Sequence, residues 1–374
     1  MLNVLTIFGT RPEAIKLAPV IKELQKASGI CSKVAVTGQH RQMLDQVLDL
    51  FQIKPDVDLN IMLHNQSLFQ ITNRSLTGLE KLFDQERPDL VLVQGDTTTC
   101  FAAALSAFYC QIPVGHVEAG LRTENKYNPF PEEMNRRLTT VLSDLHFAPT
   151  DLAKENLIQC GVPEKKIFVT GNTIVDALQN ILEQPIHDAH PVLERIPHNS
   201  RIILVEAHRR ENLGNPMENI CQALDKLVEN FPDLHLIFSV HKNPKVREVV
   251  YRKLQNKERI FLIEPVDYPT LIHLQSKAYL ILTDSGGIQE EAPSLGKPVL
   301  VMRKTTERPE GVKAGVAKLV GTNAKSVFLE TARLLKDKKL YNKMSRIANP
   351  YGDGKASKRI VQIIQHHFKR KKEK

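Results

Sequence analysis

The stretch that decides the fold reads DSGGIQEEAPSLGKP (residues 284–298), then VLVM (299–302) and RKTTERPE (303–310). An apolar segment, Tyr279 to Leu282, precedes it and predicts a strand that ends at a turn of small residues. Backbone amides at such a turn, where a helix begins, can hold a diphosphate. Glu290 and Glu291 follow one helical turn later, where a carboxylate can reach the two hydroxyls of a ribose. The stretch therefore predicts a nucleotide-binding site.

A simple capped turn is the structural alternative, because Asp and Ser are ordinary N-caps and Gly-Gly is an ordinary loop. The segment Thr305 to Glu310, however, follows the next predicted strand. Parallel strands place their carboxyl ends at one edge of the sheet, which is where open α/β sheets bind ligands. Two motifs at the same edge favour the nucleotide site.

Short apolar strands alternate with helical stretches along the whole chain, which is typical of parallel sheets covered by helices. Strands are predicted at 2–8, 33–37, 90–93, 114–117, 145–147 and 167–169, and again at 201–205, 234–240, 260–263, 279–282, 299–302 and 317–320. The chain is therefore predicted to be α/β, with two Rossmann-like domains facing across a cleft. We expect the domains at 1–170 and 171–355, followed by a C-terminal helix with a basic tail at 356–374. The Pro-rich segment 184–200 is expected to connect the domains rather than join a core.

The composition argues against several classes of protein. The 374 residues are 42% hydrophobic, which is enough for two ordinary domains. The sequence shows no signal peptide and no apolar run of membrane-spanning length, so we expect a cytoplasmic protein that does not enter a membrane. Five cysteines without Cys-x-x-Cys spacing predict neither disulfides nor a cysteine zinc site. The net charge of +9 suits an anionic ligand, but no recognition-helix pattern accompanies it, which argues against nucleic acid.

Three acids in the first half are candidates for proton transfer. Asp96 follows the strand at 90–93, Glu118 directly follows the strand at 114–117, and Glu132 opens a helix. Asp96 and Glu132 have structural alternatives, because Asp96 can be an N-cap and Glu132 is favourable in a first helical turn. Their number and their shared place at the strand ends favour acid and base roles, which require carboxylates in different environments.

Basic residues lie near the same strand ends. Arg11 and Lys16 flank the start of the helix that follows the first strand, although Lys16 could equally be a solvent-facing charge. We expect His116 or Arg122 to be the partner of Glu118. In the second half, His208 belongs to a basic loop that follows the strand at 201–205.

Several other chemistries lack their motifs. No Gly-x-Gly-x-x-Gly follows a strand, and the sequence contains no Walker A motif, no Gly-x-Ser-x-Gly elbow and no His-Glu-x-x-His pair. We therefore expect no cofactor and no metal.

Six motifs occur in order along almost the whole chain: GTRPEAIK (9–16), GDT (95–97), VEAGLR (117–122), PEE (131–133), HRREN (208–212) and the block at 284–310. This set resembles the non-hydrolysing UDP-N-acetylglucosamine 2-epimerases. The resemblance implies a glycosyltransferase-B-type fold, a homodimer and a C-terminal helix that crosses back onto the first domain. It also implies reversible conversion of UDP-N-acetylglucosamine to UDP-N-acetylmannosamine by elimination and re-addition of UDP, feeding bacterial surface polysaccharide synthesis.

The resemblance also implies roles for particular residues. The diphosphate would be held by Arg11, His208, Ser285, Gly286 and Gly287, the ribose by Glu291, and a phosphate or the nearby chain by Arg308. The sugar would be surrounded by Lys16, Asp96, Glu118, Glu132, Arg136 and His208. A second, activating UDP-N-acetylglucosamine would contact Gln39, Gln42, Glu132 and Arg209. Asn65 stands where some members carry arginine, which predicts weak activation, and Leu271 replaces a phenylalanine near the uracil, which argues against aromatic stacking on the base.

Three rival functions use the same features. A glycosyltransferase would share the nucleotide site but would require an acceptor and no trio of acids. A hydrolysing 2-epimerase would release the free sugar, but such relatives lack the RPEAIK run at 11–16. A UDP-sugar sensor would need only the nucleotide half.

Overall fold

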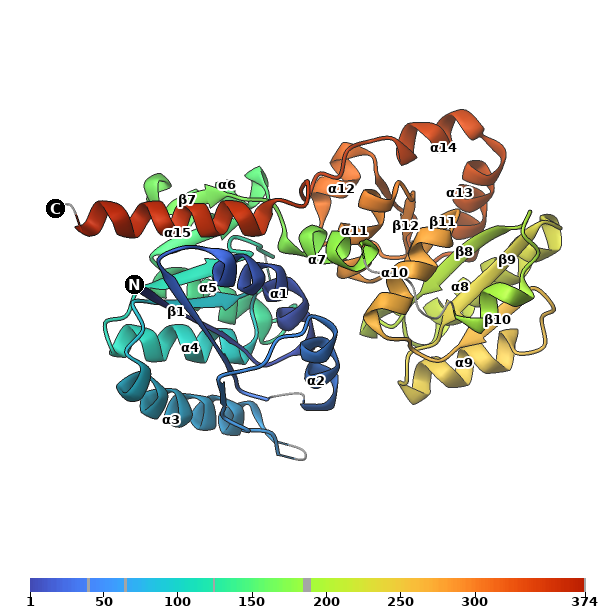
Figure 1. The fold of residues 1–374 in the computed structure, drawn as a ribbon. Helices are drawn as coiled ribbons and strands as arrows, with labels where there is room; N and C mark the ends of the chain where they lie inside the picture. Colours follow the sequence, from blue (N-terminus) through green and yellow to red (C-terminus); the bar gives the residue numbers. More distant parts are fainter. Residues whose placement is uncertain (39–40, 64–65, 124, 184–189, 373–374) are drawn as a thin grey trace. The chain divides into compact units, whose positions relative to one another are not determined.

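The computed structural model describes residues 1–372 except 39–40, 64–65, 124 and 184–189. It divides into two compact units, one made of Met1–Ala177 with Tyr351–Lys374 and the other of Leu178–Pro350 (Figure 1). Residues 171–177 and 351–355, which the sequence placed in the second domain, thus belong to the first unit. A hydrogen bond of 2.7 Å from the Asn172 backbone N–H to the Tyr351 carbonyl joins these two segments.

The described part of the first unit contains a seven-stranded parallel sheet in the order β3-β2-β1-β4-β5-β6-β7. The strands are β1 (Leu2–Phe8), β2 (Ile30–Val36), β3 (Val57–Asp58), β4 (Leu90–Gln94), β5 (Val114–Val117), β6 (Leu145–Ala148) and β7 (Ile167–Val169). All six strands predicted for this half are present, with small shifts at their ends. The sequence missed β3, because two residues are too few to show a strand pattern.

The helices of this unit follow from local signals. They are α1 (Arg11–Lys26), α2 (Arg41–Leu50), α3 (Leu68–Glu86), α4 (Thr98–Tyr109), α5 (Glu132–Leu142), α6 (Asp151–Gln159), the first turns of α7 (Thr173–Leu182), and α15 (Ala356–Lys372). Thr10 and Glu13 form a capping box at the start of α1, and its apolar face, Ala14, Ile15, Ala18, Ile21 and Leu24, is buried. A capping box satisfies backbone donors that a helix start would otherwise leave without partners.

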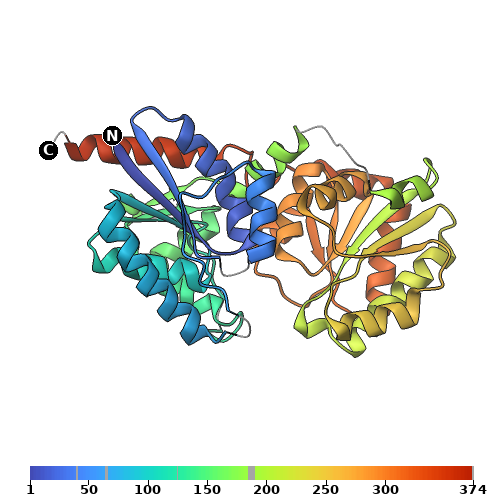
Figure 2. The same ribbon diagram turned by 60° about the horizontal axis from the view of Figure 1, so that its bottom comes forward.

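Helix α15 packs on α1 of the same unit, and both views show it alongside this unit (Figures 1 and 2). Its side chains Ile360, Val361 and Ile364 are buried. The Asp176 carboxylate accepts hydrogen bonds from the backbone of Ala356 (3.2 Å) and Ser357 (2.8 Å), the first two residues of the helix. The last helix of the chain is therefore an integral part of the first unit.

The described part of the second unit contains a six-stranded parallel sheet in the order β10-β9-β8-β11-β12-β13. The strands are β8 (Arg201–Glu206), β9 (Leu234–Ser239), β10 (Ile260–Ile263), β11 (Leu280–Thr283), β12 (Val299–Val301) and β13 (Ala317–Leu319). The helices are α8 (Asn215–Asn230), α9 (Pro244–Leu254), α10 (Tyr268–Lys277), α11 (Gly286–Glu291), α12 (Pro309–Ala314), α13 (Ala324–Lys336) and α14 (Lys338–Ser345). Apolar cores lie on both faces of the sheet, as expected for a doubly wound fold.

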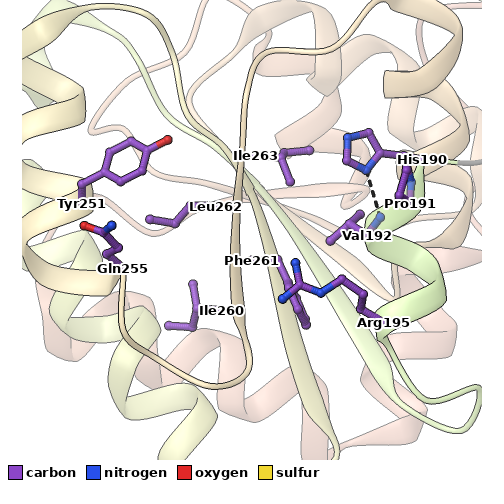
Figure 3. A pocket seen from close by; sticks show the side chains of 10 residues that line it. All are labelled: His190, Pro191, Val192, Arg195, Tyr251, Gln255, Ile260, Phe261, Leu262 and Ile263. Atoms are coloured by element: carbon purple, nitrogen blue, oxygen red, sulfur yellow. Dashed lines mark hydrogen bonds between the residues drawn. The ribbon is translucent and has the colours of Figure 1, made fainter.

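Part of the segment expected to be a connector belongs to the core of the second unit. A short 3-10 helix at Pro191–Arg195 places Val192 in that core, and Ile196 follows it there. The guanidinium of Arg195 lies 4.9 Å from the ring centre of Phe261, and the pocket between these segments is shown in Figure 3. The Pro-rich composition was thus a wrong guide for residues 190–196, because proline also fits the first turn of a helix.

Within the described residues, no helix is long and apolar enough to cross a membrane. No group of three or more His, Cys, Asp or Glu side chains in that part of the chain is arranged to hold a metal ion.

Candidate functional site

The carboxyl end of β5 carries Glu118 into a buried polar cluster of the first unit. Its carboxylate is ion-paired with Lys16 and accepts hydrogen bonds from the side-chain amides of Gln94 and Asn172, the latter at 3.0 Å. Glu118 has a backbone φ of 62°, a left-handed conformation that is uncommon for a residue with a side chain. Backbone strain of this kind concentrates at functional sites. The solvent-facing alternative for Lys16 is wrong, because its side chain is largely buried.

The partners expected for Glu118 lie elsewhere. The imidazole of His116 is 2.7 Å from the carbonyl of Gly95, and burial lowers the pKa of His116 to about 4. Arg122 donates to the Leu121 carbonyl and to the Thr140 hydroxyl. The expectation that His116 or Arg122 pairs with Glu118 is therefore wrong. The side chains that bond to Glu118 are distant from it in the sequence.

Asp96 follows β4 and is ion-paired with Arg136 of α5. It is not the N-cap of α4, because Thr97 takes that position and its hydroxyl accepts from the Cys100 backbone at 3.0 Å. Burial raises the pKa of Asp96, Arg136 opposes this effect, and the charges of Glu118 and Glu132 raise it further. Asp96 thus lies close enough to Glu118 and to Glu132 for the charge of each to act on it.

Glu132 is the first residue of α5. One of its carboxylate oxygens is buried and makes no hydrogen bond within the described residues. A buried carboxylate oxygen without a partner is costly, which suits a group that acquires its partner from a ligand. Arg11 lies in the same unit, at the first position of α1, and is half-buried.

Glu13 is a site residue that sequence reasoning missed. Its buried carboxylate accepts from the backbone of Gly9 (3.1 Å), from the backbone and hydroxyl of Thr10 (both 2.8 Å) and from the hydroxyl of Thr97 (2.7 Å). Burial raises the pKa of Glu13 to about 7. It ties the loop after β1 to the loop after β4, which contains the acid Asp96. The capping-box spacing from Thr10 to Glu13 was the signal that could have found it.

In the second unit, Asp284 joins two strand-end loops. Its buried carboxylate accepts from the backbone of His208 (2.9 Å) and Arg209 (2.9 Å) and from the side chain of Asn212 (2.8 Å). The simple cap is therefore a wrong description of Asp284. Ser285 occupies the N-cap position of α11, without a side-chain cap.

Two guanidinium groups lie against the glycine turn. A Cβ added to Gly286 would be 3.7 Å from Nη2 of Arg209 and 3.8 Å from the guanidinium of Arg308, whereas a Cβ on Gly287 would meet no atom within 4 Å. Arg308 is also ion-paired with Glu290. Two cations beside the backbone amides of a helix start can hold an anionic group such as a phosphate. Arg209, expected at a second binding site, is thus next to the turn itself.

His208 adds a third basic group to this loop cluster. Its Nδ1 lies 3.4 Å from a carboxylate oxygen of Glu206 and 3.6 Å from one of Asp284, and its ring stacks on His241 at 5.1 Å between centres. Burial lowers the pKa of His208, but the Glu206 and Asp284 carboxylates together outweigh it, so that the pKa is raised overall. The imidazole is therefore more readily protonated than an ordinary histidine.

Glu291, expected to bind the ribose, is buried in α11 and accepts a hydrogen bond from the Gln275 side chain at 2.8 Å. Burial raises the pKa of Glu291 to about 7. Gln39 and Asn65 lie outside the described residues, and the side chain of Gln42, in α2, is also outside them.

Comparison with known proteins relates both units of the chain to one family. The sequence profile of the UDP-N-acetylglucosamine 2-epimerase family matches residues 22–365. The UDP-N-acetylglucosamine 2-epimerase of Bacillus subtilis is 54% identical over 372 residues, which cover 100% of this chain and 97% of that protein.

Solved structures agree with the sequence comparison. The Neisseria meningitidis UDP-GlcNAc 2-epimerase bound to UDP-GlcNAc is 52% identical with a TM-score of 0.90, covering 98% of this chain and 100% of that one. The Methanocaldococcus jannaschii UDP-GlcNAc 2-epimerase in complex with UDP-GlcNAc and UDP is 38% identical with a TM-score of 0.82. The match covers 98% of this chain and 100% of that one.

Proposed function

The chain belongs to the UDP-N-acetylglucosamine 2-epimerase family, and we propose that it interconverts UDP-N-acetylglucosamine and UDP-N-acetylmannosamine. One observation carries the proposal: this chain places Asp96 within reach of the charges of Glu118 and Glu132 in the first unit, and flanks a glycine turn with Arg209 and Arg308 in the second. The first set suits proton transfer to and from a sugar, and the second suits a diphosphate. We assign the UDP to the second unit and the sugar chemistry to the first.

The role of the second unit is to stabilise UDP as it leaves. The C2 proton of a UDP-sugar has no neighbouring carbonyl, so its direct removal is very difficult. When the bond from C1 to the diphosphate breaks, positive charge develops at C1 and C2 becomes acidic. Arg209, Arg308 and a protonated His208 supply the positive charge that the leaving diphosphate requires, and fixed charges of this kind lower the barrier where charge develops. Gly286 and Gly287 offer backbone amides at the same turn, whereas the Ser285 amide donates to the Thr283 hydroxyl at 2.9 Å.

The role of the first unit is to move the proton. Epimerisation requires two acid/base groups, one for each face of C2, and carboxylates in different environments meet this need. The Glu118 carboxylate is surrounded by three donors, whereas burial raises the pKa of Asp96 beside Arg136. Glu132 has a carboxylate oxygen without a hydrogen bond within the described residues. Re-addition of UDP after protonation of the opposite face completes the reaction.

Neutral amide variants test this division of labour. Asp96→Asn, Glu118→Gln and Glu132→Gln should each lower turnover, by about 10²- to 10⁴-fold where the residue transfers the proton, with little change in UDP affinity measured by calorimetry. Glu164→Gln is the matched control, because Glu164 is an exposed acid of the same unit. Near-normal turnover in all three site variants would remove the acid/base assignment.

We further propose that the protein is a homodimer. Large apolar side chains are exposed on two helices that contact each other, Phe108 and Tyr109 of α4 and Met134 and Leu138 of α5. Exposed apolar patches of this kind mark interfaces in soluble proteins. Sedimentation equilibrium of the wild type against Phe108→Ser with Leu138→Ser tests it, and an unchanged monomer in both samples would contradict it.

Two further proposals concern where the protein is located and how its activity is regulated. We propose a cytoplasmic location, since the five cysteines are free thiols in the described residues, as is usual in a reducing compartment. We also propose weak activation by a second UDP-N-acetylglucosamine near Gln39, Gln42 and Arg209, as the family resemblance implies.

A further inference from the structure

Arg303 lies just after β12 and is a buried cation, 6% exposed, to which the proposed reaction gives no role. Its Nη1 and Nη2 donate to the two carboxylate oxygens of Glu307 (2.6 and 3.2 Å), and its Nε donates to Glu211 (2.7 Å). A fork of two parallel bonds fixes both the position and the direction of a carboxylate. Glu211 belongs to the loop after β8, so Arg303 joins the two loops that flank the glycine turn after β11.

Arg209 is a cation of this turn with unused donor capacity. Its Nη2 would lie 3.7 Å from a Cβ on Gly286, and its Nε is buried and makes no hydrogen bond within the described residues. Arg308, the other guanidinium beside Gly286, is ion-paired with Glu290. A buried donor without a partner is costly, which suits a group that receives an anionic ligand.

Glu307 is an acid that could take Arg209 for itself. Burial raises the pKa of Glu307, but the hydrogen bonds and charge of Arg303, together with the charge of Arg209, lower it to about 2. Glu307 is therefore an anion at neutral pH, and it lies close enough to Arg209 for their charges to interact. Without Arg303, this largely buried carboxylate would lack its compensating charge and would compete with a diphosphate for Arg209.

The loop that carries Glu307 has attachments besides Arg303. The Thr306 hydroxyl donates to the side-chain oxygen of Gln289 in α11 at 2.7 Å, and the Met302 carbonyl accepts from the side chain of Asn212 at 3.0 Å. The loop is thus held to α11 and to the loop after β8 independently of the fork. This favours control of the Glu307 charge, rather than anchoring of the loop, as the role of Arg303.

We propose that Arg303 is a positioning residue that holds the Glu307 carboxylate and so leaves Arg209 available to the diphosphate of the substrate. This inference rests on the proposed function, which assigns UDP to the second unit. Arg303 acts through Glu307 and Arg209 and does not itself bind the ligand.

The test measures the UDP affinity of the full-length protein by calorimetry. Arg303→Met should weaken UDP binding roughly ten-fold or more, which is the lower end of what a charge-assisted hydrogen bond contributes. Arg303→Met combined with Glu307→Gln should recover most of this loss, because the released negative charge is gone. Arg201→Met is the matched control and should leave UDP affinity unchanged, since Arg201 forms a similar fork with Asp233 (2.6 and 2.9 Å) at the opposite end of β8.

Circular dichroism monitors folding, and Arg303→Lys, with and without Glu307→Gln, replaces the methionine variants if these do not fold. An affinity in the double variant as low as in the single Arg303 variant would overturn the proposal, because Arg303 would then be an anchor of the loop. Unchanged affinity in the single variant would also overturn it, while leaving the proposed function intact. Absence of UDP binding in the wild type would instead overturn the proposed function, and this inference with it.

Discussion

Replacing Asp284 by alanine should destabilise the second unit and weaken UDP binding. The substitution removes the acceptor of three donors: the half-buried backbone amides of His208 and Arg209 and the buried side-chain amide of Asn212. A buried donor left without a partner costs about 1–3 kcal/mol. Because the three donors share one acceptor, their costs do not simply add. We expect a loss of about 3–5 kcal/mol in the free energy of unfolding, the range observed when one partner of a buried charged network is removed.

Urea unfolding followed by circular dichroism measures this loss, and calorimetry measures UDP affinity. Asp267→Ala is the matched control, because Asp267 is an exposed N-cap of the same unit that accepts from the Thr270 backbone at 2.9 Å. Loss of such a cap costs about 1 kcal/mol and should leave UDP affinity unchanged. Equal losses in the two variants would refute the reasoning, since Asp284 would then act as an ordinary cap. Asp284→Asn, which keeps one acceptor oxygen, should fall between them.

Three further predictions follow from other parts of the chain. Burial raises the pKa of Glu13 from 4.5 to about 7, so its stabilising effect is complete below pH 4.5 and is lost as the pH rises through about 7. The unfolding free energy of the wild type relative to Glu13→Gln should therefore fall across that range by on the order of 3 kcal/mol in urea titrations, and a flat difference would contradict this. Deletion from Ser357 onward should lower the melting temperature markedly because it removes the buried face of α15, whereas deletion from Lys369 should not; equal melting temperatures would exclude the first effect. Asn65→Arg should strengthen activation of the reverse reaction by added UDP-N-acetylglucosamine, through a charge-assisted contact worth about 1.5–3 kcal/mol, and progress curves without a response in either protein would exclude the activating site.

The fold was predictable because its determinants are local. Buried parallel strands appear as apolar runs, and the rule that ligands bind at strand ends led to Asp96, Glu118 and the turn at 284–287. The strand β3 escaped because it has only two residues. Val192 escaped because its segment has the composition of a linker, although it packs into a core.

The partners within the site were not predictable, because they depend on tertiary structure. The pairing of Glu118 with Lys16 joins residues far apart in the sequence, and the nearby His116 and Arg122 were the wrong candidates. Asp284 has the local appearance of a cap, but its acceptor role becomes visible only when β8 and β11 pair side by side. Local sequence thus indicated the strand ends at which these polar groups gather, whereas the sheet determined which groups meet there.

The most direct test of the proposed epimerisation is to incubate the pure protein with UDP-N-acetylglucosamine alone in heavy water and to follow the sugar by NMR. We predict formation of UDP-N-acetylmannosamine with deuterium from the solvent at C2, without an added cofactor or acceptor. Free N-acetylmannosamine as the main product would instead indicate a hydrolysing enzyme. No turnover without an acceptor would favour a glycosyltransferase, and epimerisation that leaves C2 without deuterium would contradict proton transfer by Asp96, Glu118 and Glu132.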